Sequence, residues 1–326
     1  MGISDHWLLG GPAYVQYRTR LDLLGLSASD PQVKSARAEM LRMPEVQNLV
    51  FSLQDWPGKV LSSHKSSNQS FHTLNFLADL GLTIEDPGMP PVIDKILATA
   101  SPEGPFRLTM NIGASHGGHG IDTGAWALCD APNLIYALIK MGLRYDPKVE
   151  KAASYLIHLV EDFGWPCGVS QELGSFHGPG KKTDPCPYAT LVMLKVMGLD
   201  PIWRNDPAAS AGVRALLKLW QERRNQHPYI FYMGTDFCKL KAPLIWYDIV
   251  HVLDVLSFFP AAIHDPRYQE MLQLVREKEQ PEGCFIPESV YIPYREWDFG
   301  QKKQPSYWLT FLIQRIFHRS SLSISD

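Results

Sequence analysis

The clearest pattern along the chain is the alternation of strongly apolar helical segments with amphipathic ones. Their starts are about 60 residues apart, and a period of this length indicates stacked supersecondary units. Several of them end in Gly-Leu, which is typical of a glycine that stops a helix. Because a helix that is apolar on all sides must be buried, we expect these segments to form an inner layer. The apolar segments begin at residues 12, 70, 132, 187, 243 and 305.

A second series of predicted helix starts lies between the first, and each of them is an Asp-Pro dipeptide. Aspartate accepts hydrogen bonds from the first turn of a helix, and proline at the first position gives up no needed N–H. Apolar residues follow at helical spacing, with charged residues between them, so these segments are predicted to be outer helices. The dipeptides are Asp30-Pro31, Asp86-Pro87, Asp146-Pro147, Asp206-Pro207 and Asp265-Pro266.

The whole pattern predicts an all-α fold, since no segment shows the alternation typical of a strand. Repeated units with one apolar helix each favour closure into an α/α toroid, a double-layered ring of about six helical hairpins. An open superhelix is the alternative. The ring would form a single domain over residues 1–326.

Composition and charge narrow the class of protein. The formal net charge of -3 gives no reason to expect nucleic acid or an anionic membrane surface as a partner. The longest apolar stretch, residues 244–263, contains Asp248, His251 and Asp254 and is too polar to span a membrane. The first residues do not form a secretory signal, and the odd number of cysteines, five, favours reduced thiols. We therefore expect a cytoplasmic protein without a transmembrane segment; the sequence leaves its oligomeric state open.

All five cysteines lie in the loops between the predicted units. In an α/α toroid these loops gather at one end of the ring, and several of the cysteines closely precede an inner helix. A helix N-terminus favours the thiolate, which is the form that binds zinc. The alternative is a set of unrelated buried cysteines beside capping aspartates. The predicted zinc ligands are Cys129, Cys167, Asp184, Cys186 and Cys238, with His177 as a substitute.

Two other groups of polar residues are candidates for chemistry. His116, His119 and His177 lie in Gly-rich loops, where they could reach a metal or substrate, or simply lie at the surface. Asp248 and His251 are three residues apart, so a continuous helix would place both on one face.

A carboxylate beside an imidazole suits general acid–base catalysis, and an internal structural pair is the alternative. Asp130 and Asp236 are further candidate acids, because each lies in an inter-unit loop close to a cysteine. Aromatic and histidine side chains near the inner-helix starts could line a cavity and stabilise a carbocation by cation–π contact. For each of them the alternative is packing in the core. The candidates for substrate binding are Tyr14, Tyr17, His72, Tyr136, Tyr188, Trp246, Tyr247 and Trp308.

This layout resembles the terpenoid cyclase/protein prenyltransferase superfamily of α/α toroids, and within it the short bacterial prenyltransferase and squalene-oxidase repeat proteins. The resemblance is carried by the inner-helix starts, the Asp-Pro starts, and the segments "SLQDWPG", "VEDFGWPCG" and "EKEQPEGCF". These segments are similar to the turns of squalene cyclases, and the resemblance covers about residues 10–318.

The resemblance implies an enzyme that acts on a hydrophobic, isoprenoid-like small molecule in a central cavity. It would be a zinc-dependent transferase, or a cyclase with Asp248 or Asp130 as its acid. The chain departs from both patterns. It lacks an Asp-x-Asp-Asp string, and the inner start after Asp184-x-Cys186 is Ala242-Pro243, where prenyltransferases have a zinc-binding histidine. Two alternatives stay open: a non-catalytic binding or scaffold toroid, and a carbohydrate-active toroid with two working carboxylates.

Overall fold

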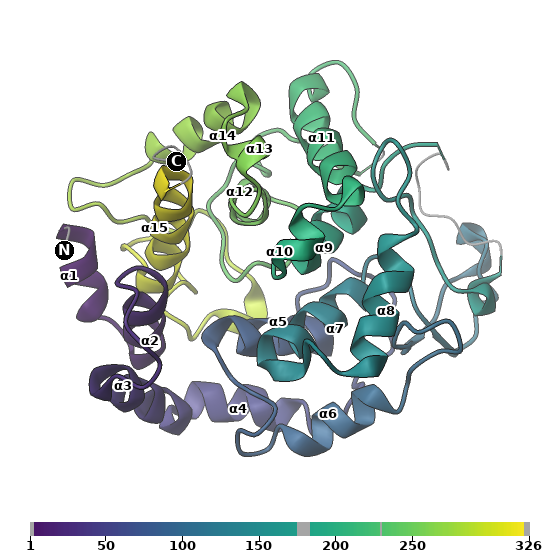
Figure 1. The fold of residues 1–326 in the computed structure, drawn as a ribbon, viewed down its shortest axis with the longest axis horizontal. Coiled ribbons are helices and arrows are strands. Elements are labelled where there is room, and N and C mark those ends of the chain that lie inside the picture. Colours follow the sequence, from purple (N-terminus) through teal and green to yellow (C-terminus); the bar gives the residue numbers. More distant parts are fainter. Residues whose placement is uncertain (1–2, 175–182, 229, 323–326) are drawn as a thin grey trace. The chain divides into compact units, whose positions relative to one another are not determined.

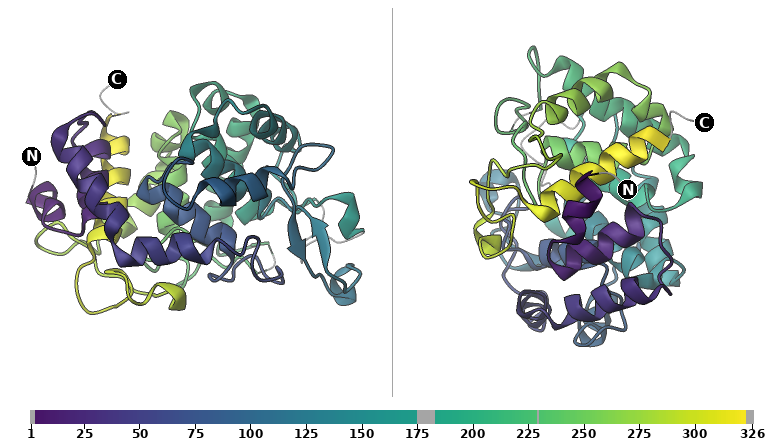
Figure 2. Two further views of the ribbon diagram at one scale, coloured as in Figure 1. Left: turned by 90° about the horizontal axis from the view of Figure 1, so that it is seen from below. Right: turned by 90° about the vertical axis from the view of Figure 1, so that its left-hand side faces the viewer.

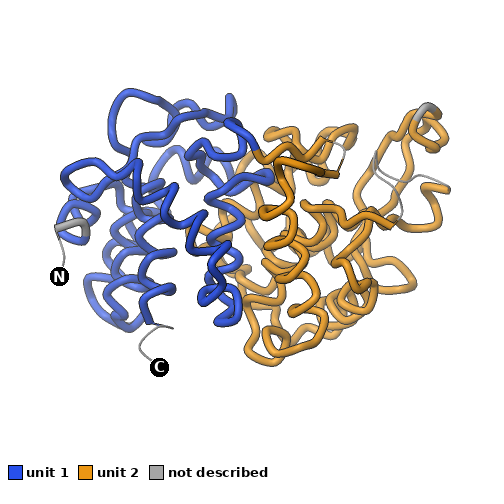
Figure 3. Tube along the Cα trace, turned by 90° about the horizontal axis from the view of Figure 1, so that it is seen from above, with its two compact units in different colours: residues 1–49, 234–326 blue, residues 50–233 orange. Residues whose placement is uncertain are grey.

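The computed structural model describes residues 3–174, 183–228 and 230–322. The chain divides into two compact units, coloured separately in Figure 3. Unit 1 consists of residues 1–49 and 234–326, and unit 2 of residues 50–233. Helices dominate both units.

The inner helices of unit 2 are the apolar segments predicted from the sequence. Helix α7 (Ala131–Leu138) lies between α5 (Ser70–Leu80) and α9 (Pro187–Met197), as Figure 1 shows, and continues into the π-helical turn η2 (Ile139–Leu143). Every residue of α7 and of α9 is buried. This burial explains why these helices carry apolar residues on all their faces.

The outer helices of unit 2 begin mostly at Asp-Pro dipeptides, as predicted. They are α6 (Pro90–Leu97), α8 (Pro147–Ile157), α10 (Pro201–Arg204) and α11 (Pro207–Glu222). The Oδ1 atom of Asp146 accepts hydrogen bonds from the backbone of Lys148 and Val149 at 2.9 and 3.2 Å, which caps α8.

Two Asp-Pro dipeptides depart from the predicted series. Asp86-Pro87 does not begin a helix, because the Asp86 side chain accepts the backbone N–H of Thr83 at 2.7 Å in a turn, and α6 begins three residues later. Conversely, Asp200-Pro201 is not part of the series with the spacing of about 60 residues, yet it begins the four-residue helix α10, with Asp200 as its cap.

A short antiparallel hairpin is the only sheet among residues 3–174, 183–228 and 230–322. It consists of β1 (Leu108–Met110) and β2 (Thr123–Ala125), with Thr109 opposite Gly124 (Figure 2). Single 3₁₀ turns, η1 (Ala114–His116) and η3 (Gln171–Leu173), lie in the surrounding loops of unit 2. The prediction of a helical fold without longer strands is confirmed for these residues.

The inner helices of unit 1 are α2 (Ala13–Asp22), α12 (Ile249–Leu256) and α15 (Tyr307–Leu322). Helix α15 contacts both α12 and α2, so the last predicted repeat packs beside the first. The other elements are α1 (Ile3–Leu9), α3 (Pro31–Arg42), α4 (Pro44–Ser52), α13 (Pro260–Ile263), α14 (Pro266–Arg276) and η4 (Ile292–Tyr294). Helix α3 packs on α2, and α14 packs on α12.

One inner helix begins later than the hydrophobic pattern predicts. The segment that starts at Pro243 is not helical until Ile249, where α12 begins. Asp248 caps this helix, because its Oδ1 atom accepts the backbone N–H of His251 at 3.0 Å. The apolar residues before it are buried as irregular backbone, which a period of apolar residues cannot distinguish from helix.

Each unit is thus built from helical hairpins that pair an apolar inner helix with an amphipathic outer one. This arrangement confirms the predicted all-α class and the hairpin repeat of an α/α toroid. The grouping of all repeats into one domain stays a prediction. In the described part of the chain, no helix combines the length and apolar character that crossing a membrane requires. The cytoplasmic location also stays a prediction.

Candidate functional site

Asp248 in unit 1 is a wholly buried carboxyl group that is only half satisfied by hydrogen bonds. Its Oδ1 atom caps α12, whereas its Oδ2 atom has no hydrogen-bond partner among the described residues. Burial raises the pKa of Asp248 to about 7, although the backbone hydrogen bond and a nearby lysine oppose the rise. The side chain therefore keeps a proton up to neutral pH, which an ordinary aspartate does not.

A second carboxyl group close to Asp248 has the opposite character. Burial alone would raise the pKa of Asp236, but Lys241 and Lys239 outweigh it and hold that pKa below its ordinary value. The Nζ atoms of these lysines lie 3.0 and 3.2 Å from the two Asp236 carboxylate oxygens. The negative charge of Asp236 in turn helps to raise the pKa of Asp248. The two environments push the two pKa values apart, which is the pattern of an acid and its partner base.

His251 and the aromatic side chains complete this part of unit 1. The Nδ1 atom of His251 lies 2.9 Å from the carbonyl oxygen of Trp246. Since Asp248 precedes the helix, the predicted pair on one helix face is wrong: the aspartate contacts His251 through its backbone N–H. The rings of Phe237 and Tyr247 pack with centroids 5.3 Å apart, and Trp246 beside them is partly exposed.

Asp130 in unit 2 also occupies the N-cap position of an inner helix, α7, but its side chain makes no capping hydrogen bond to that helix, and both of its oxygens have other partners. Its Oδ2 atom lies 2.8 Å from Nε2 of His64, and its Oδ1 atom accepts the backbone N–H of Ala127 at 3.3 Å. Burial raises the pKa of Asp130, and the His64 hydrogen bond opposes that rise. Asp130 is therefore a carboxyl group whose contacts lie within its own unit.

Three of the predicted zinc ligands, Cys129, Cys167 and Cys186, come together in unit 2. The thiol of Cys186 hydrogen bonds with those of Cys129 and Cys167. Cys238 lies in unit 1, where its carbonyl oxygen accepts Nζ of Lys278 at 2.7 Å.

Zinc binding at the predicted ligands stays a prediction. The described residues contain no group of three His, Cys, Asp or Glu side chains that could hold a metal ion. Asp184 is partly exposed ahead of α9, and His116 and His119 are exposed. The substitute ligand His177 lies outside the described residues.

The side chains predicted to bind substrate lie mostly in the cores of the two units. Trp246 alone among them is partly exposed; the buried ones are Tyr14, Tyr17, His72, Tyr136, Tyr188, Tyr247 and Trp308. Burial also lowers the pKa of His72 to about 3, so its ring is neutral, and its Nε2 atom lies 2.8 Å from the carbonyl oxygen of His64. These positions fit the alternative of core packing.

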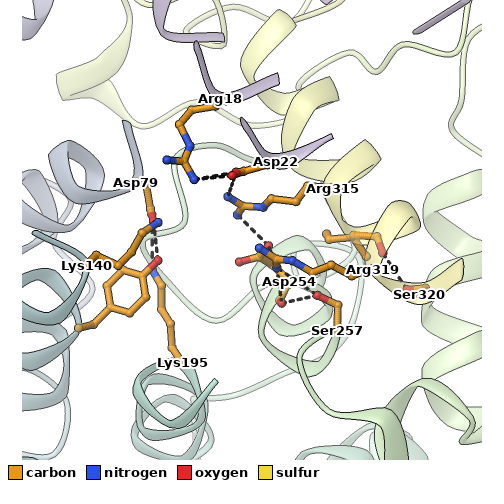
Figure 4. Close-up of polar contacts among 12 residues, drawn as sticks. Arg18, Asp22, Asp79, Lys140, Lys195, Asp254, Ser257, Arg315, Arg319 and Ser320 are labelled. Atoms are coloured by element: carbon orange, nitrogen blue, oxygen red, sulfur yellow. Dashed lines mark hydrogen bonds and ion pairs between the residues drawn. The ribbon is translucent and has the colours of Figure 1, made fainter. Parts of the chain in front are cut away.

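Sequence reasoning missed a buried ion pair that occurs once in each unit (Figure 4). In unit 2, Asp79 accepts Nζ of Lys140 at 2.9 Å, and in unit 1, Asp254 accepts Nη2 of Arg315 at 2.8 Å. In both pairs the partners are 61 residues apart, so the base lies one repeat after the acid. This shared spacing within the repeat was the feature that could have revealed both pairs.

Each pair is extended by a second base. In unit 2, Nζ of Lys195 lies 3.7 Å from Asp79 and 4.2 Å from the centroid of the Tyr136 ring. In unit 1, Nη1 of Arg319 lies 3.1 Å from Asp254. The bases come from the inner helices α9 and α15 and from η2. These clusters tie neighbouring inner helices together within each unit.

Comparisons with known proteins identify no family. No family profile matches the chain, and no curated protein matches it. Among solved structures the chain resembles a variant of UGL, an unsaturated glucuronyl hydrolase, with the saccharide dGlcA-Glc-Rha-Glc. The TM-score is 0.46, the sequence identity is 13%, and the match covers 94% of this chain and 84% of that chain.

These findings correct the resemblance drawn from the sequence. The structure found is a carbohydrate-processing enzyme, so the predicted relation to terpenoid cyclases and protein prenyltransferases is wrong. No comparison supports the isoprenoid-like substrate or the hydrophobic small-molecule partner. The turn segments and helix starts that suggested the relation are features of the helical hairpin repeat, not of one chemistry. At this TM-score, the likeness carries no argument about the substrate of this chain.

Proposed function

We propose that this chain is a carbohydrate-active hydrolase in which Asp248 is the general acid and Asp236 is the second carboxylate. The observation that carries the proposal is the buried Oδ2 atom of Asp248, which has no hydrogen-bond partner among the described residues. Buried polar atoms in folded proteins are nearly always paired, and the exceptions need an explanation. A carboxyl group that is protonated at neutral pH and has one unused oxygen fits proton donation to a substrate.

The two carboxyl groups divide the work of glycoside hydrolysis between them. Asp248 would give its proton to the glycosidic oxygen as the bond from that oxygen to the anomeric carbon breaks. Lys241 and Lys239 keep Asp236 ionised. Asp236 would either take a proton from the water that attacks the anomeric carbon, as a general base, or attack the anomeric carbon itself, as a nucleophile. Water supplies the hydroxyl group of the new reducing end, and its remaining proton restores the acid.

The surroundings of the pair suit a sugar better than an apolar chain. Trp246 is partly exposed beside Asp248 and offers an aromatic face on which a sugar ring can stack. Lys241 and Asp236 add a charged pair whose donors and acceptors match hydroxyl groups. By contrast, the aromatic side chains needed to line a hydrophobic cavity are buried in the cores of the units.

The proposal is tested by measuring release of reducing ends from a panel of neutral and uronate-containing oligosaccharides. Wild-type protein should hydrolyse at least one class, and Asp248→Asn and Asp236→Asn should abolish that turnover while each variant keeps a cooperative unfolding transition. Asp146→Asn, in an outer-helix cap, is the matched control and should retain activity. If wild-type protein binds a saccharide by calorimetry without cleaving it, the chain is a non-catalytic binding protein and the proposal fails.

A further inference from the structure

Unit 2 contains a second cluster of reactive side chains, made from three loops that are far apart in the sequence. The backbone N–H of Leu128 donates to the carbonyl oxygen of Gly168 at 2.9 Å. The backbone N–H of Cys186 donates to the carbonyl oxygen of Trp165 at 2.8 Å. These two hydrogen bonds hold the segment that contains Cys167 between the residue before Cys129 and the start of α9.

The thiols of this cluster contact one another, with Cys186 at the centre. Cys186 hydrogen bonds with both Cys129 and Cys167, and all three are thiols rather than disulfides. Cys186 is 9% exposed, whereas its two neighbours are partly exposed. The side chain of Asn133 holds the carbonyl oxygen of Cys129 at 2.9 Å and so fixes the backbone on that side. A central buried cysteine thus lies between two cysteine residues that are partly exposed.

The surroundings of Cys129 and Cys186 keep both thiols protonated. The pKa of Cys186 lies well above its ordinary value, because Cys186 hydrogen bonds with Cys129 and is buried. The hydrogen bond from Cys186 lowers the pKa of Cys129, but burial and neighbouring negative charges outweigh it, so the net shift is upward. Both groups are therefore protonated at neutral pH, and an exchange reaction begins with loss of a proton from one of the thiols.

We infer that Cys129, Cys167 and Cys186 form a thiol–disulfide site, in which a small-molecule disulfide oxidises the cluster and joins Cys186 to Cys129 or Cys167. The convergence of the three thiols in one place carries this inference, which is independent of the proposed hydrolase site in unit 1. Contact between the thiols places two sulfur atoms within reach of each other before any reaction.

The reaction balances in two exchange steps. The thiol of Cys129 or Cys167 loses its proton to solvent, attacks one sulfur of the small disulfide, forms a mixed disulfide and releases one small thiolate. The thiol of Cys186 then loses its proton and attacks the protein sulfur of that mixed disulfide, which releases the second small thiolate. Both leaving thiolates take up protons, so two electrons and two protons pass from the protein to the small disulfide. A bond from Cys186 to Cys129 would also link the starts of α7 and α9 and restrain the unfolded chain.

The test uses the full chain and oxidised glutathione as the probe. The treated protein should lose two thiols, measured after denaturation, and its mass should fall by about two hydrogen atoms. Peptide mapping should find Cys186 linked to Cys129 or Cys167, and the melting temperature should rise and return after reduction. Glutathione adducts without an internal disulfide, or a link through Cys238 or Cys284, would overturn the inference.

Matched variants separate this site from general thiol oxidation. Cys186→Ala should abolish the internal disulfide, whereas Cys284→Ala, which removes another buried cysteine, should leave it unchanged. If Cys186→Ala does not fold, the double variant Cys129→Ser/Cys167→Ser takes its place and should also fail to form the disulfide. Metal analysis of the untreated protein provides an independent check, because a stoichiometric zinc ion released only when these thiols are blocked would assign the cluster to metal binding instead.

Discussion

Asp130 and Asp248 occupy equivalent positions in the two units, yet their surroundings differ in a way that separates structure from function. Each occupies the N-cap position of an inner helix, each is wholly buried, and burial raises the pKa of each. In unit 2, both oxygens of Asp130 are used, by His64 and by a backbone N–H. In unit 1, Oδ2 of Asp248 has no such partner among the described residues. Burial and a raised pKa are therefore shared by both, and only the unused oxygen distinguishes a candidate acid.

Near the C-terminal ends of two inner helices, α5 and α12, the two units resemble each other. Asp79 in unit 2 and Asp254 in unit 1 each bind a base one repeat later, and each binds a second base as well. One unit uses lysines and the other arginines, but all the carboxylate charge is compensated. A feature that repeats with its partners intact is best explained by the packing of the fold.

The largest effect is expected from Asp248→Asn. Removal of a general acid typically lowers turnover by about 10²–10⁴-fold, and the amide cannot donate a proton in its place. The side chain keeps its shape and can still accept the backbone N–H of His251, so the melting temperature should change little near pH 4, where the wild-type carboxyl group is also protonated. Steady-state kinetics and calorimetry on the same preparation test this. Retained turnover would remove the distinction between Asp248 and Asp130.

A large loss of stability without a specific loss of activity is expected from Asp254→Asn. Arg315 is 3% exposed at its side chain and would lose its closest carboxylate. Breaking a buried ion pair by removing one partner typically costs about 3–5 kcal/mol, because the remaining charge is buried without compensation. Urea unfolding measures the change, with Asp79→Asn as the matched variant in unit 2. A loss below about 1 kcal/mol would show that these pairs behave like exposed salt bridges.

The pH dependence of stability should reveal the raised pKa of Asp248. Its pKa rises from 3.8 to about 7 in the folded state, so between these values the folded protein holds a proton that the unfolded chain has lost. This contribution to stability is complete below pH 4 and disappears as the pH rises through 7. Relative to Asp248→Asn, wild-type protein should therefore lose roughly 1.4 kcal/mol per pH unit in this window, or on the order of 4 kcal/mol in total. Unfolding free energies that run parallel from pH 4 to 7 would contradict it.

The sequence predicted the fold far better than the site, and particular residues show why. Apolar helices and Asp-Pro caps obey local rules, so α8, α11 and α14 begin where the sequence predicts. The start of α12 was placed six residues early, because buried irregular backbone carries the same apolar residues as a helix. The partners of Asp79 and Asp254 lie in other helices, and no local rule selects between lysine, arginine and an unpaired oxygen. Chemistry inferred from the fold alone therefore led to a family that the comparisons contradict.

A moderate effect on stability alone is expected from Asp130→Asn. The change weakens the contact with His64 and leaves the wholly buried side chain at position 130 less well satisfied, which typically costs about 1–3 kcal/mol. Turnover by the proposed site in unit 1 should not change in the folded protein. A double-mutant cycle with His64→Ala isolates the pair, since the second substitution should cost less once the first is present. A loss of turnover as large as that of Asp248→Asn would instead make Asp130 part of the active site.

The smallest effect is expected from Asp146→Ala, which removes an ordinary helix cap. Asp146 accepts two backbone N–H groups at the start of α8, and loss of such a cap typically costs about 1 kcal/mol. Asp248→Ala removes a cap of the same kind from α12, but it also takes away a buried carboxyl group whose Oδ2 is unused. If Asp248 were only a cap, both alanine variants would lose a similar amount of stability and no turnover. We expect them to differ: Asp146→Ala should lower the melting temperature slightly at full activity, whereas Asp248→Ala should be inactive. Because burial of the carboxyl group costs free energy near neutral pH, Asp248→Ala should also lose less stability at pH 7 than at pH 5, a change that Asp146→Ala should not show.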